Sequence, residues 1–416
     1  MNREHADVLI VGGGPAGLSA ALELRRRGAD RVIVAEREQQ AGGIPRHSDH
    51  LGFGMRDLHR VLSGPAYARH YVRAAIAAGA EIRTGTSVAG WVGTRVLTTT
   101  APTGITEIEA GAVVLATGCR ERPRSARLIP GDRPAGIFTT GAVQQLVHIY
   151  EHKVGRRAVI VGAEDVSFSA VMTLRHAGAE IAALVTEHPA HETYPLLALA
   201  TTGIHRIPIL ANCRVSRIFG HDRVEGVELI GADGATSQID CDTIVFTGDW
   251  IPELELAARG DIAMNLGTKG PSVDPLLRCS APGVFAIGNL LHGAETSDVA
   301  ASEGRRVASS IVDWSRSGRW VGDSEVPVVV ADPISWVTPD ILPIEAGDAA
   351  SSDRLTLRVS RFVERSRIEI RQAGAPLWTG RPLGRLVPGR SFHVPTSWAS
   401  RARAGAGPVT LRLAEC

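Results

Sequence analysis

The sequence predicts an α/β protein in which two similar strand-turn-helix units are followed by a smaller domain of β-strands alone. An apolar run at residues 8–11 enters a Gly-x-Gly-x-x-Gly turn at 12–17 and then a helical pattern. A second apolar strand at 154–161 is followed by a similar turn and helix. From about residue 318 the pattern changes to short alternating runs separated by glycine and proline, which is typical of antiparallel strands.

The first turn has the features of a dinucleotide-binding site. Gly12 can take the tight turn, Gly14 lets the backbone approach a pyrophosphate closely, and Gly17 lets the helix pack on the strand. The phosphates are expected to lie against the free N–H groups at the start of the helix. Glu36 ends the second strand, nineteen residues after Gly17, and can accept hydrogen bonds from both hydroxyls of an adenosine ribose. This Rossmann-like unit is therefore predicted to bind a dinucleotide.

The composition favours an enzyme that acts on a small molecule. Lysine and arginine together number 45 against 44 acidic residues, so no basic field would recruit nucleic acid. We expect no membrane insertion, because no apolar run approaches 18 residues, and a cytoplasmic location, because the first residues lack a signal-peptide pattern. The five cysteines stand singly, so we expect neither a metal site, an iron–sulfur cluster nor a redox disulfide.

Five motifs occur in an order that resembles a known family. They are the GGGPAG turn at 12–17, Glu36, the glycine pair at 42–43, ATG at 116–118 and AIGN at 286–289. Together they resemble the FAD domain of the two-dinucleotide-fold flavoproteins, the glutathione- and thioredoxin-reductase superfamily. The resemblance covers about residues 6–315 and implies that the first unit binds FAD.

The resemblance also implies which residues contact FAD. In the family a late strand carries an acid that binds the ribityl chain, and Asn289 stands in its place here. The following helix would point its N-terminus at the flavin pyrimidine, where its dipole stabilises negative charge. The residues expected to contact FAD are Gly12, Gly14, Pro15, Ala16, Gly17, Glu36, Arg37, Gly43, Val88, Ala116, Thr117, Gly118, Gly288, Asn289, Thr296 and Ser297.

The second unit interrupts the FAD domain and has a degenerate turn. Glu164 occupies the second glycine position and Ser167 the third, so a carboxylate lies where a pyrophosphate needs bare backbone. We expect the fold of this NAD(P)-type unit to be retained and its binding of NAD(P)H to be doubtful. The predicted division is an FAD-binding domain at 1–150 and 261–317, the NAD(P)-type unit at 151–260, and a C-terminal β-sandwich-like domain at 318–416.

The cofactor implies two-electron redox chemistry. The segments GGIPRH and ATGCRERPR are similar to those of the FAD-bearing alpha subunits of dye-linked proline dehydrogenase, opine oxidase and hydrogen cyanide synthase. This similarity implies hydride transfer from a small amine or amino-acid-like substrate to flavin N5, with electrons passing to an acceptor that can be a partner protein or second subunit. Two alternatives remain open: an NAD(P)H-dependent flavin reductase serving a quinone, dye or partner protein, and a flavin-holding subunit of a larger complex.

Four side chains are candidates for the substrate chemistry. Arg46 can hold a carboxylate and His47 can accept a proton, because both closely follow Gly43. His292 and Glu295 lie between the ribityl strand and the flavin-facing helix. The alternatives are that Arg46 and His47 only contact FAD or cap a loop, and that Glu295 only complements the helix N-terminus.

Overall fold

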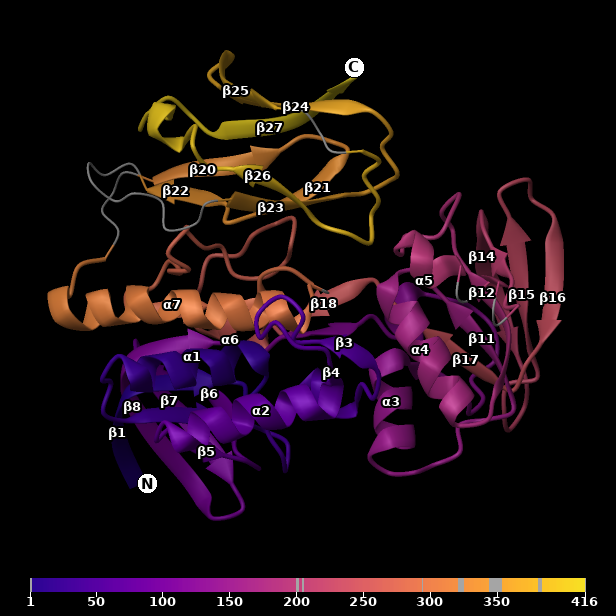
Figure 1. Ribbon diagram of the computed structural model, residues 1–416, viewed down its shortest axis with the longest axis horizontal. Helices are drawn as coiled ribbons and strands as arrows, with labels where there is room; N and C mark the ends of the chain where they lie inside the picture. The colour runs from indigo at the N-terminus through magenta and orange to yellow at the C-terminus, as the bar shows by residue number, and fades with distance from the viewer. Residues whose placement is uncertain are drawn as a thin grey trace.

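The computed structural model of the protein consists of two α/β units and a C-terminal domain of strands (Figure 1). It describes residues 2–199, 202–203, 206–293, 295–320, 325–343, 354–380 and 384–415. Among these residues, no helix has both the length and the apolar character needed to cross a membrane. The mixed α/β architecture with a final sheet domain confirms the predicted fold class.

The first unit is a seven-stranded sheet in the order β5-β2-β1-β8-β7-β6, with β19 beside β8. The strands β5, β2, β1, β8 and β19 run parallel, and β6 and β7 form an antiparallel meander against β8. The carboxyl ends of the parallel strands therefore meet at one edge. The bounds are β1 (Asn2–Val11), β2 (Val32–Ala35), β5 (Glu81–Arg83), β6 (Ser87–Gly93), β7 (Val96–Ala101), β8 (Gly104–Leu115) and β19 (Val284–Ala286).

Two helices from distant parts of the chain pack closely in this unit. A Cβ atom at Gly304 would collide with the carbonyl oxygen of Ala16, so only glycine allows α7 (Ser297–Ser317) to approach α1 (Pro15–Arg26) this closely. This contact brings the N-terminus of α7 to the edge where the first glycine turn lies. The smaller elements of the unit are β3 (Leu51–Phe53), β4 (Leu62–Ser63), α2 (Gly64–Ala77) and α6 (Glu255–Arg259).

The second unit is a parallel sheet in the order β10-β17-β11-β12-β13, followed by an antiparallel β14-β15-β16 sheet. The sequence predicts that residues 1–150 belong to the FAD-binding domain, but β10 within this range pairs with β17, so the second unit begins before residue 151. The antiparallel pair β9 (Cys119–Glu121) and β18 (Trp250–Pro252) connects the two units. The bounds are β10 (Ile137–Thr139), α3 (Thr140–His148), β11 (Arg157–Val161), α4 (Asp165–His176), β12 (Glu180–Val185), α5 (Pro195–Leu199), β13 (Ile209–Leu210), β14 (Cys213–Phe219), β15 (Gly226–Gly231), β16 (Thr236–Asp240) and β17 (Thr243–Phe246).

The C-terminal domain has two sheets, β22-β20-β27-β24-β25 and β21-β23-β26, that share one apolar core. Leu357 of one sheet and Leu411 of the other are fully buried, as is Trp398. Figure 1 shows this domain stacked on α7. The bounds are β20 (Glu325–Val330), β21 (Ile334–Thr338), β22 (Ile341–Pro343), β23 (Arg354–Val359), β24 (Ser366–Gln372), β25 (Ala375–Gly380), β26 (Phe392–Pro395) and β27 (Val409–Glu415).

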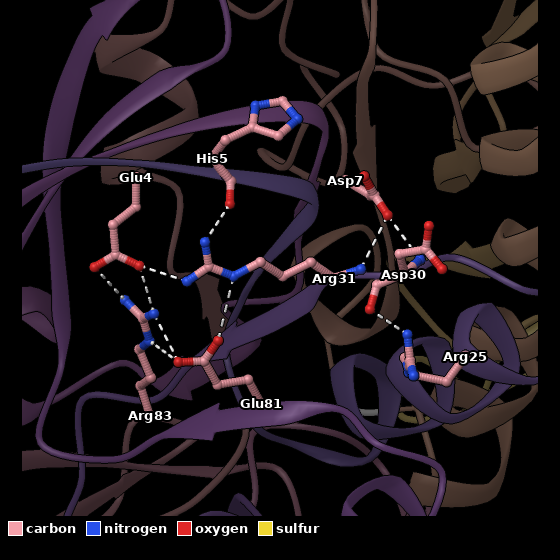
Figure 2. A network of polar contacts seen from close by, with 8 residues as sticks. All are labelled: Glu4, His5, Asp7, Arg25, Asp30, Arg31, Glu81 and Arg83. Atoms are coloured by element: carbon pink, nitrogen blue, oxygen red, sulfur yellow. Dashed lines mark hydrogen bonds and ion pairs between the residues drawn. The ribbon is translucent and has the colours of Figure 1, made fainter.

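An ion-pair network joins the amino-terminal part of β1 with Arg31, which precedes β2, and with Glu81 and Arg83 of β5 (Figure 2). One carboxylate oxygen of Glu4 accepts hydrogen bonds from Arg31 at 2.6 Å and Arg83 at 2.8 Å. Arg83 also pairs with Glu81 at 2.6 Å. The hydrogen bond from Arg83 and, to a lesser extent, the one from Arg31 hold the pKa of the Glu4 carboxyl below its ordinary value. The network stabilises the edge of the sheet that lies opposite the glycine turn.

We expect the substitution Glu4→Gln to lower the melting temperature by about 1–2 °C, because one acceptor serves two guanidinium groups. The lowered pKa means that the contribution of Glu4 is present above about pH 4.5 and is lost as the pH falls through the folded value. Thermal unfolding at pH 7 and pH 3, with and without 1 M salt, measures this. The control is Glu109→Gln, which removes one exposed pair with Arg3. Equal melting temperatures for the two variants at pH 7 would contradict the prediction.

Candidate functional site

The turn between β1 and α1 leaves backbone N–H groups available for an anion. A Cβ atom at Gly12, where φ is +111°, would collide with the carbonyl oxygen of Ala116 at the end of β8. A Cβ atom at Gly17 would collide in the same way with the carbonyl oxygen of Gly12. Gly14 is the N-cap of α1 and, among the described residues, no side chain caps this helix. The arrangement fits a pyrophosphate at the positive end of α1.

Glu36 holds the other side of this turn. Its carboxylate accepts hydrogen bonds from the N–H groups of Gly13 at 2.9 Å and Glu38 at 2.8 Å. Burial raises the pKa of the Glu36 carboxyl, and the two backbone donors oppose this shift. The N–H of Thr86 donates to the carbonyl of Glu36 at 2.9 Å, which brings the start of β6, and with it Val88, beside the acid. These groups fit the adenosine end of a dinucleotide.

Two further segments close around the turn. The backbone of Gly43 lies against Gly14, since a Cβ atom there would be 2.9 Å from the Cα of Gly14. The hydroxyl of Thr117 donates to the carbonyl of Glu253 at 2.8 Å and fixes the ATG segment after β8. The side chain of Arg37 is two-thirds exposed and lies 3.8 Å from Glu253. Direct contact between these residues and FAD stays a prediction.

The segment after β19 supplies the other end of the site. Asn289 lies in a short 3-10 turn, η4 (Gly288–Leu290), and its side-chain nitrogen donates to the carbonyl of Glu295 at 3.1 Å. Its side-chain oxygen is buried and has no hydrogen-bond partner among the described residues. The helix α7 begins beside it with Thr296 as N-cap and no side-chain cap among those residues. An unpartnered acceptor next to a helix N-terminus fits the ribityl hydroxyls and pyrimidine of FAD.

His292 forms a buried ion pair with a residue that no sequence motif marks. Its Nε2 lies 2.9 Å from Oε1 of Glu303 on α7, and Oε2 of Glu303 accepts a hydrogen bond from the N–H of Gly288 at 2.8 Å. Burial disfavours both charges, but their mutual attraction prevails, so the pKa of His292 is raised and that of Glu303 is lowered. Glu303 therefore fixes both His292 and the turn that presents Asn289.

Glu295 reaches the C-terminal domain. Its carboxylate pairs with the guanidinium of Arg358 on β23 at 3.3 Å, and both side chains are nearly buried. The guanidinium carbon of Arg358 lies 5.1 Å from the centre of the Trp336 ring. Burial lowers the pKa of Arg358, while Glu295 opposes the shift. Nothing in the sequence marked Arg358, because its domain carries no motif of the family.

Arg46 and His47 have partners within the protein, which favours the alternative that they only contact FAD or cap a loop. Arg46 pairs with Glu38 and donates to the carbonyl of Gln40 at 3.2 Å, so its charge is already matched. His47 is buried next to Gln144 of α3. Burial, reinforced by the charge of Arg46, lowers the pKa of His47 to about 4, so its imidazole is neutral at neutral pH. Their roles as carboxylate holder and proton acceptor stay predictions.

The helix α4 of the second unit is capped by the protein itself. Glu164 is its N-cap and forms a capping box with Ser167, in which each side chain accepts the other residue's backbone N–H. The hydroxyl of Thr247 donates to the same carboxylate at 3.0 Å. Burial raises the pKa of Glu164 to about 7. A side-chain carboxyl thus occupies the helix end where a dinucleotide would place its pyrophosphate.

Residues 6–304, well over half of the chain, match the sequence profile of the pyridine nucleotide-disulphide oxidoreductase family. The chain belongs to this family. It is an FAD-dependent oxidoreductase, and some family members also use NAD(P)H. The family assignment confirms the resemblance seen in the five motifs and FAD as the cofactor.

Several known proteins are similar to parts of this chain. Sarcosine oxidase subunit alpha from Corynebacterium sp. (strain P-1) is 33% identical over 200 residues, which are 43% of this chain and 19% of that protein. Ferredoxin--NADP reductase from Salinispora tropica is 28% identical over 304 residues, 69% of this chain and 86% of that protein. Subunits of opine oxidase and hydrogen cyanide synthase also match, as the motifs predicted. The chain spans about a fifth of the length of the sarcosine oxidase subunit.

A solved structure shows the fold of the family core. Thioredoxin reductase from Lactococcus lactis aligns with a TM-score of 0.63 at 18% identity, over 74% of this chain and 99% of that chain. The similarity confirms a thioredoxin-reductase-like arrangement of the two α/β units.

We expect Asn289→Leu to weaken FAD binding about tenfold, because the unpartnered oxygen would no longer accept a ribityl hydroxyl. Asn289→Asp is the matched control, since it keeps an acceptor oxygen while it loses the donor to Glu295 and gains a negative charge. Fluorescence titration of the deflavinated proteins with FAD gives both affinities. A wild-type affinity in the leucine variant would show that Asn289 does not contact the cofactor.

We expect His292→Gln to destabilise the protein by about 3 kcal/mol at pH 5.5, since it removes the closer of the two cations beside the buried Glu303 and leaves only Arg306 at 3.9 Å. Because the pKa of His292 is raised in the folded protein, its contribution to the free energy of unfolding is full below pH 6.5 and is lost as the pH rises through the folded-state pKa. Because the pKa of Glu303 is lowered, its contribution to the free energy of unfolding is full above pH 4.5 and is lost at lower pH. The loss in melting temperature should thus be larger at pH 5.5 than at pH 9. His221→Gln, at an exposed histidine, is the control; a pH-independent loss would contradict the prediction.

Proposed function

We propose that this protein is an FAD-dependent dehydrogenase or oxidase that takes electrons from a small amine or amino-acid-like substrate rather than from NAD(P)H. The contrast between two helix N-termini carries the proposal. In the part of the chain that the structure describes, α1 begins at Gly14 without a side-chain cap, whereas α4 begins at Glu164 with its own carboxyl in place.

The capped end of α4 disfavours a nicotinamide dinucleotide for two reasons. The carboxyl of Glu164 is buried and accepts hydrogen bonds from the hydroxyls of Ser167 and Thr247, so a ligand would have to break both hydrogen bonds to reach the helix end. A pyrophosphate would also bring negative charge next to a carboxyl group that is ionised above about pH 7. An organic electron donor at the flavin does not meet either obstacle.

The relatives named sarcosine oxidase and opine oxidase support an amine or amino-acid-like substrate. When bound, FAD supplies the hydride acceptor, N5 of the isoalloxazine. We propose that the predicted residues around the first turn and Asn289 hold it. His292 and Glu295, which form ion pairs with Glu303 and Arg358, fix the turn and the start of α7 against the flavin.

The competing function is an NAD(P)H-dependent flavin reductase. It is favoured by the ferredoxin--NADP reductase relative, most of whose length this chain matches. The relatives named as subunits support a further part of the proposal, an electron-accepting partner or second subunit. A cytoplasmic location is also part of the proposal.

Anaerobic mixing of the FAD-loaded protein with electron donors tests the proposal. We expect at least one compound from a panel of N-methyl amino acids, opines, proline and simple amines to bleach the flavin at least tenfold faster than NADH or NADPH does. Dithionite is the control that shows that the flavin can be reduced. Rapid bleaching of the flavin by NADPH would contradict the proposal and favour the NAD(P)H-dependent flavin reductase. Bleaching by no donor until a partner protein is added would favour the flavin-holding subunit.

A further inference from the structure

A loop of the C-terminal domain lies on the degenerate turn of the second unit. At Gly389, between β25 and β26, a Cβ atom would be 2.9 Å from the Cβ of Glu192 and 3.2 Å from that of Glu164. The same Cβ atom would be 3.2 Å from Oε1 of Glu192, so the backbone of Gly389 also lies against this carboxylate. The N–H of Glu192 in turn donates to the carbonyl of Ala163 at 2.9 Å. The loop, Glu192 and the turn are therefore in direct contact.

Aromatic contacts on either side extend this interface. The guanidinium carbon of Arg390 lies 4.9 Å from the centre of the Tyr194 ring, and the rings of Phe362 and His188 are 5.7 Å apart. His188, Glu192 and Tyr194 all follow β12, so they lie past the carboxyl end of the parallel sheet. In sheets of this kind, a dinucleotide lies along this edge.

We propose that residues 387–390, here called the plug loop, take the place of a nicotinamide dinucleotide on the second unit. The plug loop would thereby determine which electron donors can reduce the flavin. The proposal extends the proposed function and rests on it for the exclusion of NAD(P)H. Gly389 makes the contact possible, because any side chain there would need the space that Glu192 and Glu164 fill. The plug loop is thus a second barrier above the capped helix.

The plug loop is held in place by a domain that is itself fixed to the first unit. Arg358 pairs with Glu295, and the side-chain nitrogen of Asn265 donates to the carbonyl of Val337 at 2.8 Å. The hydroxyl of Ser272 donates to Asp340 at 2.7 Å. The loop can leave the second unit only if it bends away alone or if these contacts break.

Four FAD-loaded proteins test the proposal: the wild type, the repaired turn Glu164→Gly with Ser167→Gly, the loop variant Gly389→Glu, and the combination of all three changes. Calorimetric titration with NADH at micromolar to millimolar concentration measures binding. We expect the combined protein to bind NADH at least tenfold more tightly than the repaired turn alone, because the new side chain at 389 still collides with Glu192 and displaces the loop. Tight binding by the wild type, or no difference between the repaired-turn and combined proteins, would overturn the proposal.

Hydrogen exchange keeps the test valid if a variant folds poorly. In the wild type we expect protected amides at Gly389 and in the first turn of α4. In the Gly389→Glu protein both should exchange faster, while strands β24 and β27 stay protected. Gly90→Glu is the matched control, since a Cβ atom at Gly90 meets no atom within 4 Å.

If β24 and β27 also lose protection, Gly389→Ala is the milder replacement. Fast exchange at Gly389 in the wild type would contradict the proposal. These experiments measure binding and exchange rather than turnover. They therefore test the plug loop even if no amine proves to be a substrate.

Discussion

The positive end of an α-helix must be matched by some negative or accepting group, and the two α/β units meet this requirement differently. In the first unit the glycine turn at 12–17 keeps side chains away from α1, so a phosphate of the cofactor can supply the negative charge. In the second unit Glu164 supplies it from within the chain. Two residues, Glu164 and Ser167, thus distinguish the second turn, whose helix is capped by the protein itself, from the first turn, whose helix end is open to a ligand. We propose that Glu36, Asn289 and the N-terminus of α7 position the rest of FAD.

The features that sequence could predict are those made by neighbouring residues. The glycine turn and Glu36 are joined by a hydrogen bond across 23 positions in one strand-turn-helix-strand unit, and periodicity and spacing mark all its parts. Glu295 and Arg358 are 63 positions apart in the sequence and belong to different domains, so no local pattern predicts their ion pair. The same reason hid the contact of Gly389 with Glu192. Arg46 had a sequence-close partner in Glu38, but only the loop geometry shows that the two meet.

The C-terminal domain lies outside the part of the chain that matches the family and contacts both α/β units. The family match ends at residue 304, so the domain that starts with β20 is an addition to the two α/β units. It contacts both of them, the first through Arg358 and Asn265 and the second through the plug loop. Any rotation of one unit against the other would therefore have to break some of these contacts. The same domain both covers the second unit and links it to the first.

The discontinuity of the first unit has a consequence for biosynthesis. Its strand β19 pairs with β8, and α7 packs on α1, although the whole second unit lies between these partners in the chain. A ribosome must therefore release all of the second unit before the first sheet can be completed. Translation of the second unit takes roughly 10 to 40 s at ordinary elongation rates, and during this time the apolar faces of β8 and α1 in the nascent chain stay uncovered. Chaperone protection of the growing chain is most valuable during this interval.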